Sequence, residues 1–194
     1  TEDEKIFDDV SSNGGRAILT SKNHKTGTDR IFEAFSLLNL KNIDLIMNLQ
    51  GDEPQIDIND IINLNNKMKE NQSKLGTLAA KITELKMLQN ENVVKVKINQ
   101  SFEEESFPSA KMFTRKTNDK ENIFHHIGIY CYEKDTLKNF VSLKQSQNEI
   151  KNKLEQLRAL DNNIKVNVAL AKSSPIGVDT KEDFLALKKI MEYK

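Results

Sequence analysis

Two aspartates each follow an apolar stretch with the length and composition of a buried strand. Asp52 lies in the sequence QGDEP directly after residues 43–49, and Asp179 lies on a loop that follows residues 164–170. Ligands of open α/β sheets bind beyond the carboxyl ends of the strands. One or two carboxylates placed there, together with substrate phosphates, are the usual ligands of Mg²⁺. The spacing alone leaves a second interpretation open, in which Asp52 forms a turn and Asp179 precedes a helix cap.

A second group of polar side chains lies in the apolar stretch 123–132. Alternate side chains of a strand share one face, so His126, Gly128 and Tyr130 are predicted to point the same way. Gly128 would leave room for a ligand between the two rings. The alternative is an ordinary polar face of an antiparallel strand. No further His or Cys has the spacing of a zinc site, so zinc is not expected.

The segment 20–30 is a third candidate, because it is rich in hydrogen-bond donors and leads into a helix pattern. Its hydroxyls, the N–H of Gly27 and the helix N-terminus could hold a polar ring or an anion. The segment is not a Walker loop. The alternative is a simple helix start, with Thr28 or Asp29 as the cap.

The elements that would position these groups follow from the alternation of apolar runs and amphipathic stretches. This alternation predicts βαβ units and a mostly parallel sheet with helices on both faces. The run 93–132 holds several strands without a long helix between them, which predicts a small antiparallel lobe. Strands are expected at 16–20, 43–49, 75–82, 93–98, 110–114, 123–132 and 164–170. Helices are expected from Asp3, at 29–40, 57–71, 134–143 and 149–160, and after Thr180.

In two of these elements the spacing of the charged residues predicts which side chains face water. The sequence VVKVKI at 93–98 alternates with period two, which predicts a strand with one face in water. Within the expected helix 149–160, Glu155 and Arg158 are spaced i, i+3 and suit a surface ion pair.

Composition limits the class of protein. The 194 residues fit a single domain spanning 1–194. Lys and Arg number 29, as do Asp and Glu, which argues against binding nucleic acid or an anionic membrane by bulk charge. No apolar run approaches the ~20 residues of a membrane span. The single Cys131 excludes an internal disulfide and favours a reducing, cytoplasmic location.

Five pieces of the sequence together resemble the 3-deoxy-manno-octulosonate (Kdo) cytidylyltransferase family. They are TSKNHKTGTDRI, NLQGDEP, HHIGIYCY, KLEQLRAL and PIGVDTKEDF, in that order over nearly the whole chain. One piece alone is weakly specific, whereas the order and the gaps are strongly so. The resemblance implies a nucleotidyltransferase-type, Rossmann-like α/β fold. It also implies transfer of CMP from CTP to the sugar acid Kdo, with release of pyrophosphate, for lipopolysaccharide synthesis.

The resemblance further implies a role for each matching residue. Asp52 and Asp179 would bind Mg²⁺ and support catalysis. The residues expected to face the sugar are Gln50, His126, Tyr130, Glu155 and Gln156. Those expected near the cytidine are Thr26, Gly27 and Arg30. The resemblance also implies a homodimer, for which residues 93–132 are the expected interface.

The sequence departs from the family pattern at its start. The family opens with a strand and a loop of the type ARYxSTRLPGKPL, whose Arg and Lys bind the triphosphate, and nothing of that kind occurs here. We therefore expect the N-terminal strand and phosphate loop to be missing from this chain. Two alternatives stay open: a nucleotidyltransferase for another sugar or sugar acid, and a catalytically inactive module that binds a CMP-sugar.

Overall fold

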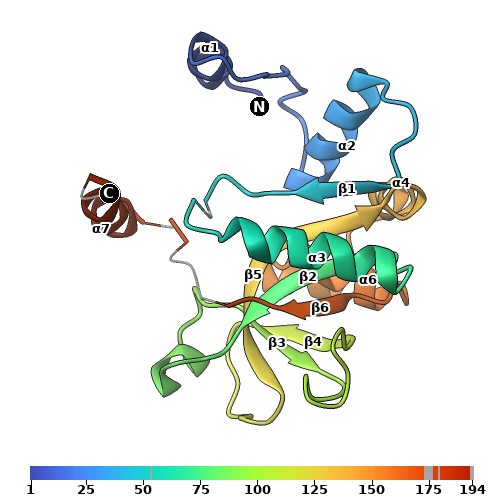
Figure 1. Cartoon of the computed structure of the whole chain (residues 1–194), viewed down its shortest axis with the longest axis vertical. Helices are drawn as coiled ribbons and strands as arrows, with labels where there is room; N and C mark the ends of the chain where they lie inside the picture. Colours follow the sequence, from blue (N-terminus) through green and yellow to red (C-terminus); the bar gives the residue numbers. More distant parts are fainter. Residues whose placement is uncertain (53, 173–176, 179, 193–194) are drawn as a thin grey trace.

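A mixed sheet with helices on both faces forms the body of the molecule (Figure 1). The computed structural model describes residues 1–52, 54–172, 177–178 and 180–192. The strands are β1 (Leu45–Asn48), β2 (Leu75–Ala80), β3 (Lys95–Ile98), β4 (Ala110–Thr114), β5 (Ile123–Glu133) and β6 (Asn167–Leu170). Their order is β4-β3-β5-β2-β6, and β1 pairs with β5. The α/β class is therefore confirmed.

The expected mostly parallel pairing is wrong for the strands that the structure describes. Among their pairings only β2–β6 is parallel, whereas β5 runs antiparallel to β1, β2 and β3. The reason is the direction from which β5 arrives. It starts in the lobe formed with β3 and β4 and continues back between β1 and β2, so it meets both in the reverse direction.

The helices cover the sheet from two sides. They are α1 (Glu4–Ser12), α2 (Gly27–Leu38), α3 (Ile58–Glu70), α4 (Lys134–Ser142), α5 (Gln147–Asn152), α6 (Leu157–Asp161) and α7 (Lys181–Glu192), with a 3₁₀ turn, η1 (Leu85–Leu88). In Figure 1, α3 crosses the front of the sheet, α4 and α6 lie behind it, and α1 and α7 stand away from it. None of the described helices is long and apolar enough to cross a bilayer.

Successive side chains of a strand point to opposite faces of the sheet, so the core forms two clusters, one on each face. Leu78 and Ala80 of β2 pack with Leu64 and Met68 of α3 on one face. Ala79, which points the other way, belongs to the cluster that includes the apolar side chains of α4 and α6. A buried strand with apolar side chains on both faces needs a helix on each, which explains the layers.

Gly76 of β2 lies against the side chains of α3 with no room for a methyl group. A Cβ at this position would lie 2.6 Å from Met68 Sδ and 3.0 Å from Leu64 Cδ1. We expect Gly76→Ala to lower the free energy of unfolding by about 1–3 kcal/mol, the usual cost of overpacking a core. Urea melts measure this. In the control Gly51→Ala the new methyl meets nothing within 4 Å, and a loss of equal size in both variants would contradict the tight packing.

The antiparallel lobe is confirmed, with one correction to its exposure. Val96 of β3 lies between Phe113 of β4 and Phe124 of β5 in the register of the three strands. Lys95 was expected on a water-facing side, yet its side chain is fully buried. Its ammonium group is paired with backbone carbonyls instead of solvent, which allows a charged group to be buried.

Two further expectations about elements are wrong. Residues 16–20 form no strand; Thr20 and Ile18 instead hydrogen bond to the backbone of Thr1. The helix after the 20–30 segment begins earlier than expected, because Thr26 rather than Thr28 or Asp29 is its cap. The predicted caps at Asp3 and Thr180 are confirmed by their bonds to the first turns of α1 and α7. Asp57 caps α3 in the same way.

Candidate active site

A cleft of about 640 Å³ collects most of the residues that the sequence singled out. Eight of them line it: Gly27, Gln50, Asp52, His126, Gly128, Tyr130, Glu155 and Gln156. They come from the start of α2, the end of β1, the strand β5 and the loop between α5 and α6. The motifs are far apart in sequence, so it is the fold that brings them to one cavity.

The cleft wall also contains residues that the sequence did not single out. They are Thr83, Met87, Asn90, Asn92, Val93, Val94, His125, Leu154, Gly177, Thr180 and Asp183. Four of these, Asn90, Asn92, Val93 and Val94, lie in the loop 90–94 before β3, and the last two were expected in a strand that begins only at Lys95. No spacing signal marks this loop in the sequence.

Asp52 lies in the turn that follows β1, and this exposed residue lines the cleft. Its backbone carbonyl accepts a hydrogen bond of 2.9 Å from the N–H of Val178. The chain after β6 thus meets the QGDEP turn, as the rule for strand ends predicts. Asp179 lies outside the described residues. Within the described part of the chain, no group of three or more His, Cys, Asp or Glu side chains could hold a metal ion.

A β-bulge in β5 shapes the middle of the cleft. Thr77 of β2 pairs with Tyr130, whereas the next residue, Leu78, pairs with Ile127, so β5 carries two extra residues there. The Thr77 hydroxyl holds the bulge by donating to the carbonyl of Ile129 at 2.7 Å. Gly128 of the bulge lines the cleft, and a Cβ there would meet nothing within 4 Å. Gly128 therefore leaves open space in the cleft, but not between the two rings as expected, because His126 and Tyr130 contact each other.

His126 is a buried, neutral imidazole. Burial, and secondarily the charge of His125, lower the pKa of His126 to about 3. Because the single hydroxyl hydrogen of Thr77 goes to Ile129, the ring Nε2–H of His126 donates to Thr77 Oγ1 at 3.0 Å. This tautomer leaves Nδ1 as an acceptor. At neutral pH the ring can orient a hydroxyl group but is a poor general base.

Tyr130 shares the wall with His126, as predicted, with 5.5 Å between the ring centroids. The aromatic contacts continue from Tyr130 to Tyr132 and from Tyr132 to Phe140. Burial raises the pKa of Tyr130 well above its ordinary value. The phenol is therefore neutral and can donate or accept a hydrogen bond in the cleft.

Glu155 and Gln156 lie in a loop rather than in the expected helix. Lys153 adopts a left-handed conformation with φ 53° and ends α5, and α6 begins only at Leu157. The turn directs both side chains toward the cleft. Burial raises the pKa of Glu155, although hydroxyls of the α2 start and the charge of Arg158 act to lower it. Its Oε1 is buried with no hydrogen-bond partner among the described residues.

The expected surface ion pair of Glu155 and Arg158 is also wrong. Arg158 is buried and pairs bidentately with Glu149, through Nε to Oε2 at 2.9 Å and Nη2 to Oε1 at 2.5 Å. The break after α5 explains this, because it turns α6 so that Arg158 faces back toward α5. Glu155 is thereby left free to face the cleft.

Gln50 is oriented by its neighbours. Its Nε2 donates to Oδ1 of the buried Asn48 at 2.9 Å. A Cβ on Gly27 would lie 3.1 Å from the same Nε2 atom, so the absence of a side chain at Gly27 lets α2 approach β1. Both residues line the cleft, as expected.

The remaining two predicted residues do not line this cleft. Thr26 caps α2 and lines a neighbouring hollow of about 430 Å³ that also touches Glu155. Arg30 pairs with Glu2 at 2.8 Å and donates to Thr20 Oγ1 at 2.6 Å. The structure thus ties Arg30 to the N-terminal segment, and its role toward the nucleotide stays a prediction.

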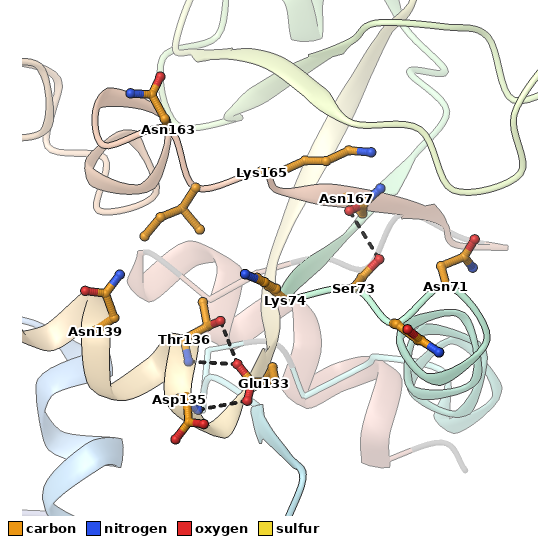
Figure 2. A pocket seen from close by; sticks show the side chains of 12 residues that line it. Asn71, Ser73, Lys74, Glu133, Asp135, Thr136, Asn139, Asn163, Lys165 and Asn167 are labelled. Atoms are coloured by element: carbon orange, nitrogen blue, oxygen red, sulfur yellow. Dashed lines mark hydrogen bonds between the residues drawn. The ribbon is translucent and has the colours of Figure 1, made fainter.

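Another hollow, of about 600 Å³, lies at the other ends of β2 and β6 (Figure 2). Its hydrogen bonds have structural roles: Glu133 caps α4, and Ser73 donates to Asn167. None of the predicted site residues lines it. The cleft at the bulge is therefore the candidate active site.

Comparison with known proteins identifies the family of the chain. The family model described as "Cytidylyltransferase" matches residues 1–167. The chain belongs to the cytidylyltransferase family. A 3-deoxy-manno-octulosonate cytidylyltransferase of Thermodesulfovibrio yellowstonii is 40% identical over 98% of this chain and 79% of its own length. The enzyme of the same name from Bartonella henselae is 37% identical over the same shares.

Solved structures place this cytidylyltransferase in the same fold. A CMP:2-keto-3-deoxy-manno-octonic acid synthetase complexed with CTP has a TM-score of 0.86 and 29% identity, over 100% of this chain and 79% of that one. A 4-diphosphocytidyl-2C-methyl-D-erythritol synthase from Anaerococcus prevotii, at 16% identity, has a TM-score of 0.59 and shares the fold alone. The nucleotidyltransferase-type fold is confirmed.

Proposed function

We propose that this cytidylyltransferase makes CMP-Kdo from CTP and the sugar acid Kdo. The anomeric hydroxyl of Kdo attacks the α-phosphorus of CTP, a new P–O bond forms, and the bond to the β-phosphate oxygen breaks. Pyrophosphate leaves, and the hydroxyl proton is released. The observation that carries the proposal is the meeting of the QGDEP, HIGIY and LEQ residues in one cleft, in a chain related to enzymes of that name.

The side chains of the cleft suit a polar, anionic sugar. Gln50, Tyr130 and Gln156 are uncharged and can bind hydroxyl groups without repelling a carboxylate. The unpaired Oε1 of Glu155 can accept a hydrogen bond from a sugar hydroxyl, which would remove the cost of leaving it unpaired. The Nδ1 of His126 offers another acceptor.

A divalent metal fits the donors of the cleft. Asp52 contributes an exposed carboxylate at the strand end, and Mg²⁺ is commonly held by one or two carboxylates plus substrate phosphates. We propose Asp52 and Asp179 as the protein ligands. When bound, Mg²⁺ would neutralise phosphate charge that otherwise repels the sugar carboxylate. Asp52 would contribute a negative charge that holds the ion in the cleft it lines.

The direct test is pyrophosphate release by the purified full-length protein with CTP, Kdo and Mg²⁺. Release that requires Kdo supports the proposal. Release only with another sugar acid or a hexose phosphate would redirect it to a different nucleotidyltransferase. Tight CMP-Kdo binding in calorimetry without any turnover would favour an inactive binding module instead.

Removal of the Tyr130 hydroxyl is expected to affect the sugar rather than the nucleotide. For Tyr130→Phe we expect the KM for Kdo to rise about fivefold, the effect of one hydrogen bond of about 1 kcal/mol. The KM for CTP should stay within twofold. Initial-rate kinetics measure both. Tyr132→Phe is the matched control, because Tyr132 is buried in the same strand but does not line the cleft; an equal rise in both variants would contradict sugar contact.

The resemblance also leads us to propose a cytoplasmic homodimer with an interface within residues 93–132. Sedimentation as a monomer at micromolar concentration would count against the dimer.

A further inference from the structure

Arg115, directly after β4, binds backbone carbonyls from two separate loops. Its Nε donates to the carbonyl of Asn152 at 2.9 Å and its Nη2 to that of Lys153 at 3.0 Å. Its Nη1 donates to the carbonyl of Glu91 at 2.9 Å. Three nitrogens of one guanidinium group therefore connect the 90–94 loop with the loop between α5 and α6.

Lys95 completes this arrangement from inside the lobe. Its fully buried ammonium group donates to the carbonyls of Asn90 at 2.9 Å and Val93 at 2.6 Å. A third bond runs to the backbone carbonyl of Arg115 itself. Burial, and then the charges of Arg115 and Lys116, lower the pKa of Lys95 to about 8. Its direct hydrogen-bond partners are carbonyl oxygens, and the charge of Glu91 also favours the ammonium form.

The two connected loops both line the candidate active site. Asn90 and Val93 line the cleft from one loop, and Leu154, Glu155 and Gln156 line it from the other. Carbonyls at 152 and 153 terminate α5, where a cation is electrostatically favoured. They immediately precede the residues predicted to face the sugar. None of the predicted nucleotide contacts belongs to either loop.

We propose that Arg115 and Lys95 are positioning residues that hold the two loops of the sugar side of the cleft at a fixed separation. The proposal rests on the proposed function. Neither residue lines the cleft, so both act through the backbone of Glu155 and Gln156 and of the 90–94 loop. A planar guanidinium can bind three carbonyls in fixed directions, whereas a lysine ammonium at the same position cannot reach all of them.

The decisive variant is Arg115→Lys, which keeps the charge and loses the three-way geometry. We expect the KM for Kdo to rise about tenfold, with the KM for CTP within twofold. Lys95→Met, which keeps the packing and removes the donors, is expected to act in the same direction. Because both residues hold the same loops, the double variant should raise the KM for Kdo by less than the product of the single effects.

Lys116→Met provides the matched control. Lys116 is the next residue, carries the same charge, and contacts the same loop through an exposed ion pair with Glu91 at 2.6 Å. The backbone carbonyls that Arg115 binds, those of Glu91, Asn152 and Lys153, receive no hydrogen bond from Lys116 in the described part of the chain. Its KM for Kdo should change less than twofold.

Hydrogen exchange separates this inference from the proposed function. In Arg115→Lys we expect faster amide exchange in both the 90–94 and the 152–156 segments, whether or not the wild type uses Kdo. Unchanged exchange in one of the two loops, or an equal rise of both KM values, would overturn the positioning role. A wild type that makes no CMP-Kdo would overturn the proposed function, while the exchange result would still decide the positioning role.

Discussion

Asp52→Asn is expected to reduce kcat for CMP-Kdo formation by about 10²–10³-fold, the typical effect of losing one group that stabilises transition-state charge. The amide keeps the size of the side chain and removes its negative charge. Asp52 is exposed in the cleft and its carbonyl, rather than its carboxylate, makes the bond to Val178. The fold should therefore survive, with an unchanged urea midpoint.

The proposed metal role adds a second measurement. Titration of Mg²⁺ into the CTP-bound protein should show weaker binding in Asp52→Asn than in the wild type. Asp8→Asn is the matched control, because Asp8 is also an exposed aspartate but lies on α1, away from the cleft. Turnover that matches the wild type in Asp52→Asn would remove Asp52 from the catalytic machinery.

The second large effect concerns stability. Arg158→Met is expected to lower the free energy of unfolding by about 3–5 kcal/mol, because it leaves the buried carboxylate of Glu149 without its partner. Both side chains are nearly inaccessible, and Arg158 also lies 4.7 Å above the ring of Phe140. The double variant Glu149→Met/Arg158→Met should recover much of the loss, since it removes both charges together.

Urea melts at pH 7 measure this loss, and Lys86→Met is the control. Lys86 pairs with Glu84 at 2.6 Å on the surface, where solvent and salt screen an ion pair so that it adds little stability. Equal losses in Arg158→Met and Lys86→Met would show that burial of the ion pair has no special effect.

The same pair predicts an acid sensitivity. Burial alone would raise the pKa of Glu149, but the hydrogen bonds and charge of Arg158, with the bond from Gln145, lower it overall. A carboxyl group with a lowered pKa in the folded state stabilises the fold above its unfolded pKa, near 4.5. This contribution is lost as the pH falls through the folded pKa. The gap between wild type and Arg158→Met should therefore narrow below about pH 4.

Local patterns account for much of the fold. The caps at Asp3 and Thr180 and the apolar run of β1 depend on neighbours within a few residues, so they could be predicted. The strand 16–20 and the single helix 149–160 could not. The first has apolar residues but pairs with no strand among the described residues. The second is broken where Lys153 adopts a left-handed backbone as the cap of α5, which no residue spacing marks.

The sequence by itself determined the chemistry of the site: carboxylates after strands, a glycine between His126 and Tyr130, and motifs that resemble one family of enzymes. Only the tertiary structure decided which residues meet. It reversed the pairing of β5, buried Lys95, and paired Arg158 with Glu149 rather than Glu155. The physical reason is that burial and long-range hydrogen bonds depend on which elements pack together, and no spacing along the chain specifies that.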